Sequence, residues 1–242
     1  LFIFSCFSLN KTYADDGNGF ECHSDVLGNF GSVTKTITGI AKFIPSCLGF
    51  CVQKEMDMLN KYVLNPEMPF TIIMGGAKIA DKLPLIEKLL PKCSHMLLTG
   101  GLANSCLKSL GLKTGESLAT VDAETLIKVK DILREYNKKI VLPFDAIVGK
   151  KYDETFAASK DINKIENDEI IGDIGPKTLK IYKKIIDESK TIFMNGTAGI
   201  YEEPKYSNGT LELLNIITSS MAKTIAGGGD CIGAIDKFNM KD

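Results

Sequence analysis

Short apolar stretches that alternate with helix-like segments limit the possible folds of this sequence more than any other feature. The predicted strands are residues 70–74, 95–99, 139–142, 191–194 and 223–226. Strands that alternate with helices are typical of parallel βαβ units, because each parallel strand needs a crossover before the next one. We therefore predict an α/β fold with a doubly wound parallel sheet.

Helices are predicted between these strands and before the first of them. Leu48, Val52, Met56, Leu59 and Val63 recur at steps of three and four, which indicates an amphipathic helix. We place this helix from Ser46, its predicted N-cap, to about Leu64. The other predicted helices cover residues 81–90, 102–110, 122–136, 176–189 and 208–221, and Asp122 caps the third of them.

Two segments show no clear periodicity of apolar residues. Residues 10–34 are polar and contain several glycines, which predicts a turn or flexible loop. We interpret residues 145–174 as a loop with short strands, and we expect its charged side chains to face solvent.

Four of the five predicted strands end in turns that contain glycine. These turns are Gly75-Gly76, Gly100-Gly101, Asn195-Gly196 and the segment 227–230. Glycine lets the backbone approach a ligand closely, and ligands of doubly wound sheets bind at the carboxyl ends of the strands. Four such turns at one edge indicate a ligand of the nucleotide type.

The first of these turns continues into two lysines. Lys78 and Lys82 are four residues apart, so they can share one face of the helix that follows. The N–H groups at the start of a helix attract anions. The segment therefore predicts a phosphate-binding turn, although its spacing is not that of a Walker A loop. A glycine turn with two surface lysines and no ligand is the alternative interpretation.

The composition argues against several classes of protein. The formal net charge is −1, so there is no overall basic field that would favour nucleic acid or a membrane surface. Arg134 is the only arginine, and planar bidentate grips on phosphate usually need arginine. Phosphate binding is therefore expected to rest on lysines, backbone amides and metal ions.

Cysteine and histidine usage gives no sign of a zinc site. The chain has seven cysteines without a CxxC motif, and its only histidines are His23 and His95. Seven is an odd number and the cysteines are scattered, which suits a reducing compartment, and we expect a cytoplasmic protein.

The apolar run 1–9 is too short to span a bilayer, and it lacks the charged start of a signal peptide. A truncated signal segment stays an alternative, and the missing initial methionine indicates a fragment or a processed chain.

Five sequence blocks closely resemble the phosphoglycerate kinase family. In order along the chain, the blocks are Gly75–Ile86 (family pattern GGAKVSDKLPLI), Thr99–Ala103 (GGGMA), Asp173–Thr178 (DIGPKT), Asn195–Glu202 (NGPMGVFE) and Gly227–Cys231 (GGGDS/T). The resemblance covers about residues 39 to 239. It implies the Rossmann-like C-terminal domain of a two-lobed kinase that transfers a phosphoryl group between 1,3-bisphosphoglycerate and ADP in glycolysis, using Mg²⁺.

The resemblance also implies a role for each matching residue. Lys78 and Lys82 would be catalytic, contacting the nucleotide phosphates and the migrating phosphoryl group. Asp230 would hold the magnesium of ATP or ADP, and Glu202 would bind the ribose hydroxyls. The remaining residues implied in nucleotide binding are Ala77, Gly100, Gly101, Gly175, Asn195, Gly196, Ile200, Gly228, Gly229 and Cys231. Without a nucleotide, Asp230 could simply cap the next helix, and Glu202 could be a solvated turn charge.

The same resemblance suggests how the chain is divided. Residues 1–38 would be a divergent remnant of the N-terminal lobe or an irregular segment, and residues 39–65 the interdomain helix region. Residues 66–242 would be the nucleotide-binding C-terminal domain without its last segment, which carries STGGGAS in the family. The first lobe of the family binds the triose phosphate through arginine and histidine, but the HRAH positions are Gly31, Ser32, Val33 and Thr34 here.

These departures leave three hypotheses open. The first is a phosphoglycerate kinase, seen as a partial chain, with 3-phosphoglycerate and 1,3-bisphosphoglycerate as substrates of the complete enzyme. The second is a degenerate homologue that binds nucleotide without turnover, and the third is a structural or interaction protein. For these 242 residues alone we expect nucleotide binding with little or no transfer. We expect a monomer that binds neither nucleic acid nor membrane.

Overall fold

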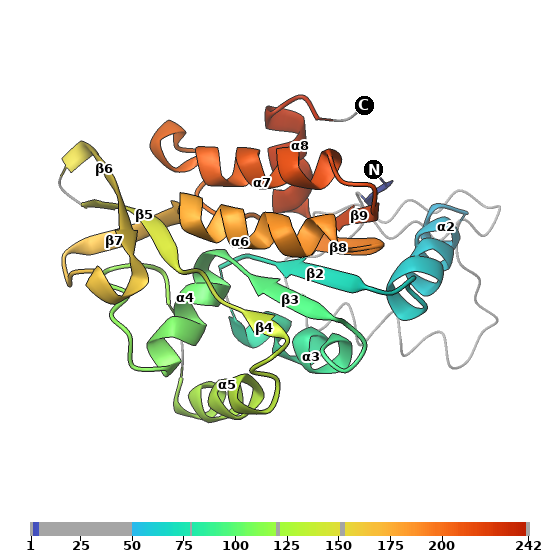
Figure 1. Cartoon of the computed structure of the whole chain (residues 1–242), viewed down its shortest axis with the longest axis horizontal. Coiled ribbons are helices and arrows are strands. Elements are labelled where there is room, and N and C mark those ends of the chain that lie inside the picture. Colours follow the sequence, from blue (N-terminus) through green and yellow to red (C-terminus); the bar gives the residue numbers. More distant parts are fainter. Residues whose placement is uncertain (1, 5–49, 78, 120–121, 151–152, 241–242) are drawn as a thin grey trace, which may run out of the picture.

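The computed structural model describes residues 2–4, 50–77, 79–119, 122–150 and 153–240, and a six-stranded sheet lies at its centre (Figure 1). Every neighbouring pair of strands in this sheet is parallel. The strands in spatial order are β1 (Phe2–Phe4), β9 (Lys223–Gly227), β8 (Thr191–Asn195), β2 (Phe70–Met74), β3 (His95–Leu98) and β4 (Ile140–Val141). All five predicted strands are confirmed, and β1 is an addition from the apolar start of the chain.

Helices cover both faces of this sheet, as Figure 1 shows. One face carries α3 (Ile79–Leu89), α4 (Gly100–Ser109) and α5 (Ala123–Glu135), and the other carries α6 (Pro176–Asp187), α7 (Asn208–Thr218) and α8 (Gly229–Lys237). The doubly wound α/β fold is therefore confirmed. Asp122 is the N-cap of α5 as predicted, since its Oδ1 accepts a hydrogen bond of 2.8 Å from the Thr125 amide.

Two apolar cores lie on the two faces because successive side chains of a strand point in opposite directions. In β2, Ile72 and Met74 belong to the core beneath α3 and α4, whereas Ile73 belongs to the core beneath α6, α7 and α8. All three side chains are fully buried. Strands that are apolar on both faces are typical of parallel sheets covered by helices, and this explains the uninterrupted apolar runs in the sequence.

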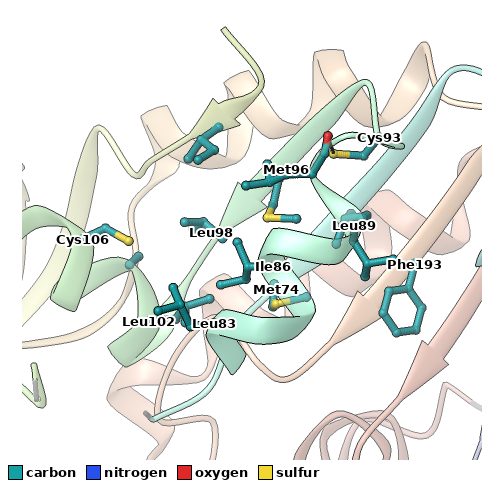
Figure 2. Packing of buried hydrophobic residues seen from close by; sticks show 14 of the residues in the cluster. Met74, Leu83, Ile86, Leu89, Cys93, Met96, Leu98, Leu102, Cys106 and Phe193 are labelled. Carbon is teal, nitrogen blue, oxygen red and sulfur yellow. Dashed lines mark hydrogen bonds between the residues drawn. The ribbon is translucent and has the colours of Figure 1, made fainter. Parts of the chain in front are cut away.

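Figure 2 shows the first of these cores at close range. Met74, Met96 and Leu98 project from the sheet toward α3, which presents Ile86 and Leu89 on its inner face. Burial of each such side chain contributes about 1.5–3 kcal/mol relative to an exposed one. The packing holds α3 against the sheet and so sets where the helix begins, next to the first glycine turn.

A second, smaller sheet is packed beside the central one. Its strands are β5 (Asp145–Lys150), β6 (Asp153–Asp161) and β7 (Glu169–Ile174), and they run antiparallel in the order β6-β5-β7. The sequence predicted a loop with short strands over residues 145–174. This prediction was wrong about the regularity of the segment, because pairing between the three strands stabilises it without a clear amphipathic pattern.

The expectation that the charges of this segment face solvent was also wrong for three carboxylates. Asp145, Glu169 and Asp173 are each at most 2% exposed. The Glu169 Oε1 atom forms an ion pair of 2.5 Å with the Lys160 ammonium. Asp145 accepts hydrogen bonds from the Lys177 and Thr178 amides. Partners distant in the sequence compensate these buried charges.

The remaining helical segments connect the main elements. They are α2 (Phe50–Leu59), the π-helix η2 (Asn60–Leu64) that continues it, and the 3₁₀ turns η3 (Ile162–Lys164) and η4 (Pro204–Tyr206). The predicted helix ending at Leu64 is confirmed from Phe50 onward. Its predicted N-cap Ser46, and all predictions for residues 5–49, lie outside the described residues.

Candidate functional site

The four glycine turns meet at one edge of the central sheet, as predicted. They follow the carboxyl ends of β2, β3, β8 and β9, which are parallel. The turns also bond to one another. The Gly75 amide donates to the Asn195 carbonyl at 2.9 Å, and the Leu102 amide donates to the Gly76 carbonyl at 2.9 Å. The edge is therefore a connected backbone surface.

Several positions in these turns have room for glycine alone, Gly75 and Gly196 among them. A Cβ at Gly75 would lie 2.0 Å from the Thr197 carbonyl oxygen and 2.6 Å from the Thr99 hydroxyl. Gly196 has a φ of +92°, and a Cβ there would lie 2.7 Å from the Gly75 carbonyl carbon. The first case is a steric requirement, and the second adds a backbone conformation that L-residues rarely adopt.

Lys82, on the first turns of α3, points into this edge. Its ammonium donates to the Gly75 carbonyl at 2.6 Å and to the Asn195 side-chain oxygen at 2.5 Å. A third oxygen, the Asn195 carbonyl, lies 3.4 Å away. The ammonium is thus held between β2 and β8 at the point where their carboxyl ends meet.

The environment of Lys82 lowers the pKa of its ammonium. Burial is the main cause, and it is opposed by the negative charge of Asp230 across the edge. A desolvated ammonium interacts more strongly with a nearby anion than a solvated one does. Lys78, predicted as its partner, lies outside the described residues.

Two cavities open at this edge. The first, here called the Lys82 cleft, has a volume of about 460 Å³. Its apolar wall includes Leu59, Val63, Leu85, Leu89 and Phe193, and its polar wall includes Lys82, Lys88, Asn195, Gly196, Gly228, Gly229 and Asp230. The second, here called the Glu202 cavity, has a volume of about 250 Å³. It lies between α4, β7 and the loop that follows β8, and Asp230 lines it as well.

The structure gathers most of the predicted site residues around these two cavities. The Lys82 cleft takes Lys82, Asn195, Gly196, Gly228, Gly229 and Asp230, and the Glu202 cavity takes Ala77, Gly100, Gly101, Ile200, Glu202 and again Asp230. Asp230 lies in the first turn of α8, and the N-cap of that helix is Gly228. The alternative in which Asp230 serves as a helix cap is thus not what the structure shows.

Two predicted residues lie elsewhere. Gly175 lines neither cavity and is the N-cap of α6, packed against the Asp145 carboxylate. Cys231 is fully buried in the core beneath α8. Cys231 directly follows Asp230, which lines both cavities, and Gly175 lies two residues after Asp173, which lines the Glu202 cavity.

Other residues of the Glu202 cavity were not predicted. They are Asn104, Leu118, Ile170, Ile171, Gly172, Asp173, Thr197, Ala198, Gly199 and Tyr201. Asp173 is the first residue of the block Asp173–Thr178, whose resemblance to the family was recognised in the sequence, so that block could have identified Asp173 as a site residue. The burial of Asp173 raises the pKa of its carboxyl from 3.8 to about 7, against the lowering effect of hydrogen bonds from three backbone amides.

The buried cysteines give the first testable prediction. Burial raises the pKa of the Cys231 and Cys106 thiols to about 12 and that of Cys93 to about 11. The reactive thiolate is then only about one part in a thousand or less at pH 8. We expect iodoacetamide at pH 8 to leave all three unlabelled in the folded chain and to label them in guanidinium, as measured by peptide mass spectrometry. Labelling of Cys231 in the folded chain would contradict its burial on the inner face of α8.

Metal and membrane features are sparse in the described part of the chain. Those residues contain no group of three or more His, Cys, Asp or Glu side chains that could hold a metal ion. None of the helices described here has the length and apolarity needed to cross a bilayer.

Comparison with known proteins identifies strong similarity to one family. A family model described as phosphoglycerate kinase matches residues 26–242. The chain is 42% identical over 222 residues to a phosphoglycerate kinase of Finegoldia magna, which covers 90% of this chain and 56% of that protein. It is 39% identical over 240 residues to the phosphoglycerate kinase of Wigglesworthia glossinidia brevipalpis, covering 97% of this chain and 59% of that protein.

Solved structures agree with the sequence comparison. Phosphoglycerate kinase from Coxiella burnetii matches with a TM-score of 0.75 and 34% identity, over 81% of this chain and 51% of that one. The enzyme from Pyrococcus horikoshii OT3 matches with a TM-score of 0.69 and 26% identity, over 83% of this chain and 51% of that one. The chain therefore spans little more than half the length of the relatives it matches.

Proposed function

Because this chain belongs to the phosphoglycerate kinase family, we propose that it binds ADP or ATP at the edge where its four glycine turns meet. We propose that it does so for phosphoryl transfer between 1,3-bisphosphoglycerate and ADP. The observation that carries this proposal is the position of Asp230, which lines both cavities. A single elongated ligand can therefore extend from the ammonium of Lys82 to the carboxylate of Glu202.

The Lys82 cleft suits the phosphate end of such a ligand. Lys82 supplies a positive charge, and Asn195 supplies a side-chain amide. Gly228 and Gly229 stand at the N-terminus of α8, where unpaired backbone N–H groups favour anions. A Cβ at Gly229 would have no atom within 4 Å, so the backbone there faces open space that a phosphate can enter.

The Glu202 cavity suits the nucleoside end. Leu118, Ile171 and Ile200 give it apolar walls for a base, and Gly100 and Gly101 let the backbone approach closely. Glu202 is exposed at its rim, where a carboxylate can accept hydrogen bonds from ribose hydroxyls.

The side chains present fit a magnesium ion that arrives with the nucleotide. The described residues contain no group of three or more metal ligands, and Mg²⁺ in such sites takes most of its ligands from substrate phosphates and water. Asp230 is an exposed carboxylate beside the proposed phosphate position, and Mg²⁺ is commonly held by one or two carboxylates together with substrate phosphates. When bound, the ion neutralises phosphate charge.

The chemistry that these residues perform is positioning and charge neutralisation, which is most of what phosphoryl transfer requires. Lys82 is held in place by hydrogen bonds to the Gly75 carbonyl and the Asn195 side-chain oxygen. Its charge is therefore preorganised to stabilise negative charge on the phosphoryl oxygens in the transition state.

A degenerate homologue that binds nucleotide without turnover is the second candidate. The observation that favours it is Gly31, Ser32, Val33 and Thr34, which replace the HRAH pattern of the family. None of these side chains can grip a phosphate as an arginine does. Conversion of 1,3-bisphosphoglycerate and ADP by the purified chain, above a Lys82→Ala background, would exclude this candidate.

The division of the chain follows from the same proposal. We assign residues 66–242 to a nucleotide-binding domain and residues 39–65 to an interdomain helix region, with residues 1–38 as a divergent remnant of a first lobe. The 3-phosphoglycerate of the reaction would then be bound mainly outside the described residues. We propose a cytoplasmic monomer with nucleotide and phosphoglycerate as its partners.

Calorimetric titration of the purified chain with Mg-ADP tests nucleotide binding. We expect saturable binding, and we expect Asp230→Asn to weaken it about tenfold because the metal loses its carboxylate. Removal of Mg²⁺ with EDTA is expected to weaken binding in the parent and to have less effect in Asp230→Asn. Asp236→Asn, on an exposed position of the same helix α8, is the matched control and should bind as the parent does. A folded parent chain that does not bind Mg-ADP would refute the proposal.

A further inference from the structure

Asp173 is a buried carboxylate at the wall of the Glu202 cavity that the proposed chemistry does not use. It lies near the end of β7 and is 2% exposed. Its Oδ1 accepts a hydrogen bond from the Ile174 amide at 2.9 Å, and its Oδ2 accepts one from the Gly209 amide at 2.6 Å. The Thr210 amide also bonds to the carboxylate. Three backbone donors from two elements thus converge on one side chain.

The surroundings of this carboxylate fit its shape closely. A Cβ at Gly199 would lie 2.5 Å from Asp173 Oδ1, and a Cβ at Gly209 would lie 2.5 Å from the same atom. The carboxylate is therefore enclosed between the loop after β8 and the first turn of α7. The positive end of the α7 dipole and its unpaired N–H groups favour a negative charge at this place.

The loop that follows β8 is tied to the immediate neighbours of Asp173. The Gly199 amide donates to the Thr210 hydroxyl at 3.1 Å, and the Ile200 amide donates to the Gly172 carbonyl at 2.8 Å. Gly172 precedes Asp173 in the chain, and the Thr210 amide binds its carboxylate. The loop carries Ile200 and Glu202, which line the nucleoside end of the site.

We propose that Asp173 is the positioning residue for the nucleoside half of the ligand. Its carboxylate joins β7 to the first turn of α7, and this junction holds the loop that carries Ile200 and Glu202. Asp173 acts through these residues and not by contact with the reacting phosphate. The inference rests on the proposed nucleotide site and assigns one part of it to a residue that sequence reasoning did not select.

The test compares two ligands that differ by the nucleoside. Mg-ADP uses both cavities, whereas Mg-pyrophosphate uses only the Lys82 cleft. Asp173→Asn keeps the shape of the side chain but removes the negative charge to which the three backbone amides donate. At pH 8.5, above the pKa of about 7 for this carboxyl, we expect the variant to raise the Kd of Mg-ADP about tenfold. The Kd of Mg-pyrophosphate should stay within twofold of the parent value, both measured by calorimetry.

Asp145→Asn is the matched control. Asp145 is also a buried aspartate that accepts hydrogen bonds from the first amides of a helix, α6, and it lines neither cavity of the site. It should lower thermal stability without changing either Kd. If Asp173→Asn does not fold, Thr210→Val removes only the acceptor of the Gly199 amide. That variant should show the same selective loss of Mg-ADP at about threefold.

The outcomes separate this inference from the proposed function. A parent that binds Mg-ADP, with Asp173→Asn binding it equally well or losing both ligands equally, overturns the inference and leaves the nucleotide site in place. A parent that binds neither ligand refutes the proposed function. Hydrogen exchange of the Gly199–Glu202 amides tests separately, without any ligand, whether Asp173 holds this loop in place. Exchange at least tenfold faster in Asp173→Asn supports it, and equal exchange in the two chains overturns it.

Discussion

Replacement of Lys82 by alanine is expected to weaken the binding of Mg-ADP by about 30-fold. The ammonium is held at the meeting point of β2 and β8 by the Gly75 carbonyl and the Asn195 side chain. Hydrogen bonds to charged groups contribute about 1.5–3 kcal/mol each, which corresponds to roughly 10- to 150-fold in affinity. Calorimetric titration of the parent and the variant under the same magnesium concentration measures the effect.

The control for this variant is Lys92→Ala. Lys92 is an exposed lysine just beyond the end of the same helix α3, and it lines neither cavity. Its removal tests whether the overall positive charge of this region matters, and it should leave the Kd within twofold of the parent value. Melting curves of both variants should show folded chains. An equal Kd for the parent and Lys82→Ala would contradict the assignment of this ammonium to the phosphates.

Replacement of Gly75 by alanine is expected to lower the free energy of unfolding by about 3 kcal/mol. The added methyl would lie 2.0 Å from the Thr197 carbonyl oxygen, which belongs to the backbone and cannot move aside as a flexible side chain can. The turns after β2 and β8 would have to separate, and the Gly75 hydrogen bond to the Asn195 carbonyl would be lost. A loss of this size is a large part of the 5–15 kcal/mol typical of a domain.

Urea denaturation measures this difference, and Gly227→Ala is its control. Gly227 also ends a strand of the central sheet, but the nearest atom to a Cβ there is 3.9 Å away, an ordinary contact. We expect Gly227→Ala to unfold within about 1 kcal/mol of the parent. If Gly75→Ala were as stable as Gly227→Ala, the close contact between the two glycine turns would not exist in solution.

Much of the fold could be predicted because its signals are local. Alternation of apolar strands with helical segments identified the parallel sheet, and the stop at Gly75-Gly76 located the first turn of the site. Asp122 could be assigned as a helix cap because the Asp122 side chain and the Thr125 amide are three residues apart. Signals of this kind depend on neighbours along the chain and need no knowledge of the tertiary structure.

The segment 145–174 could not be predicted in the same way. Its strands pair with one another across the sheet, and Ala146 is opposite both Lys160 and Ile174. The burial of Asp173 depends on the Gly209 amide, which is 36 residues away. Charged residues in an irregular pattern are usually solvated, and only distant hydrogen-bond donors can reverse that tendency.

For the candidate site too, some features could be predicted from the sequence and others could not. The glycine turns, Lys82 and Asp230 follow strand ends or begin helices, so the sequence by itself determined which residues stand at the edge where the cavities open. Only the tertiary structure decided which neighbours face a cavity. It directs Asp230 into both cavities and buries Cys231, one residue later, in the core. A step of one residue turns a side chain by about 100° around a helix, and the packing of α8 on the sheet determines which of the two side chains faces the cavities.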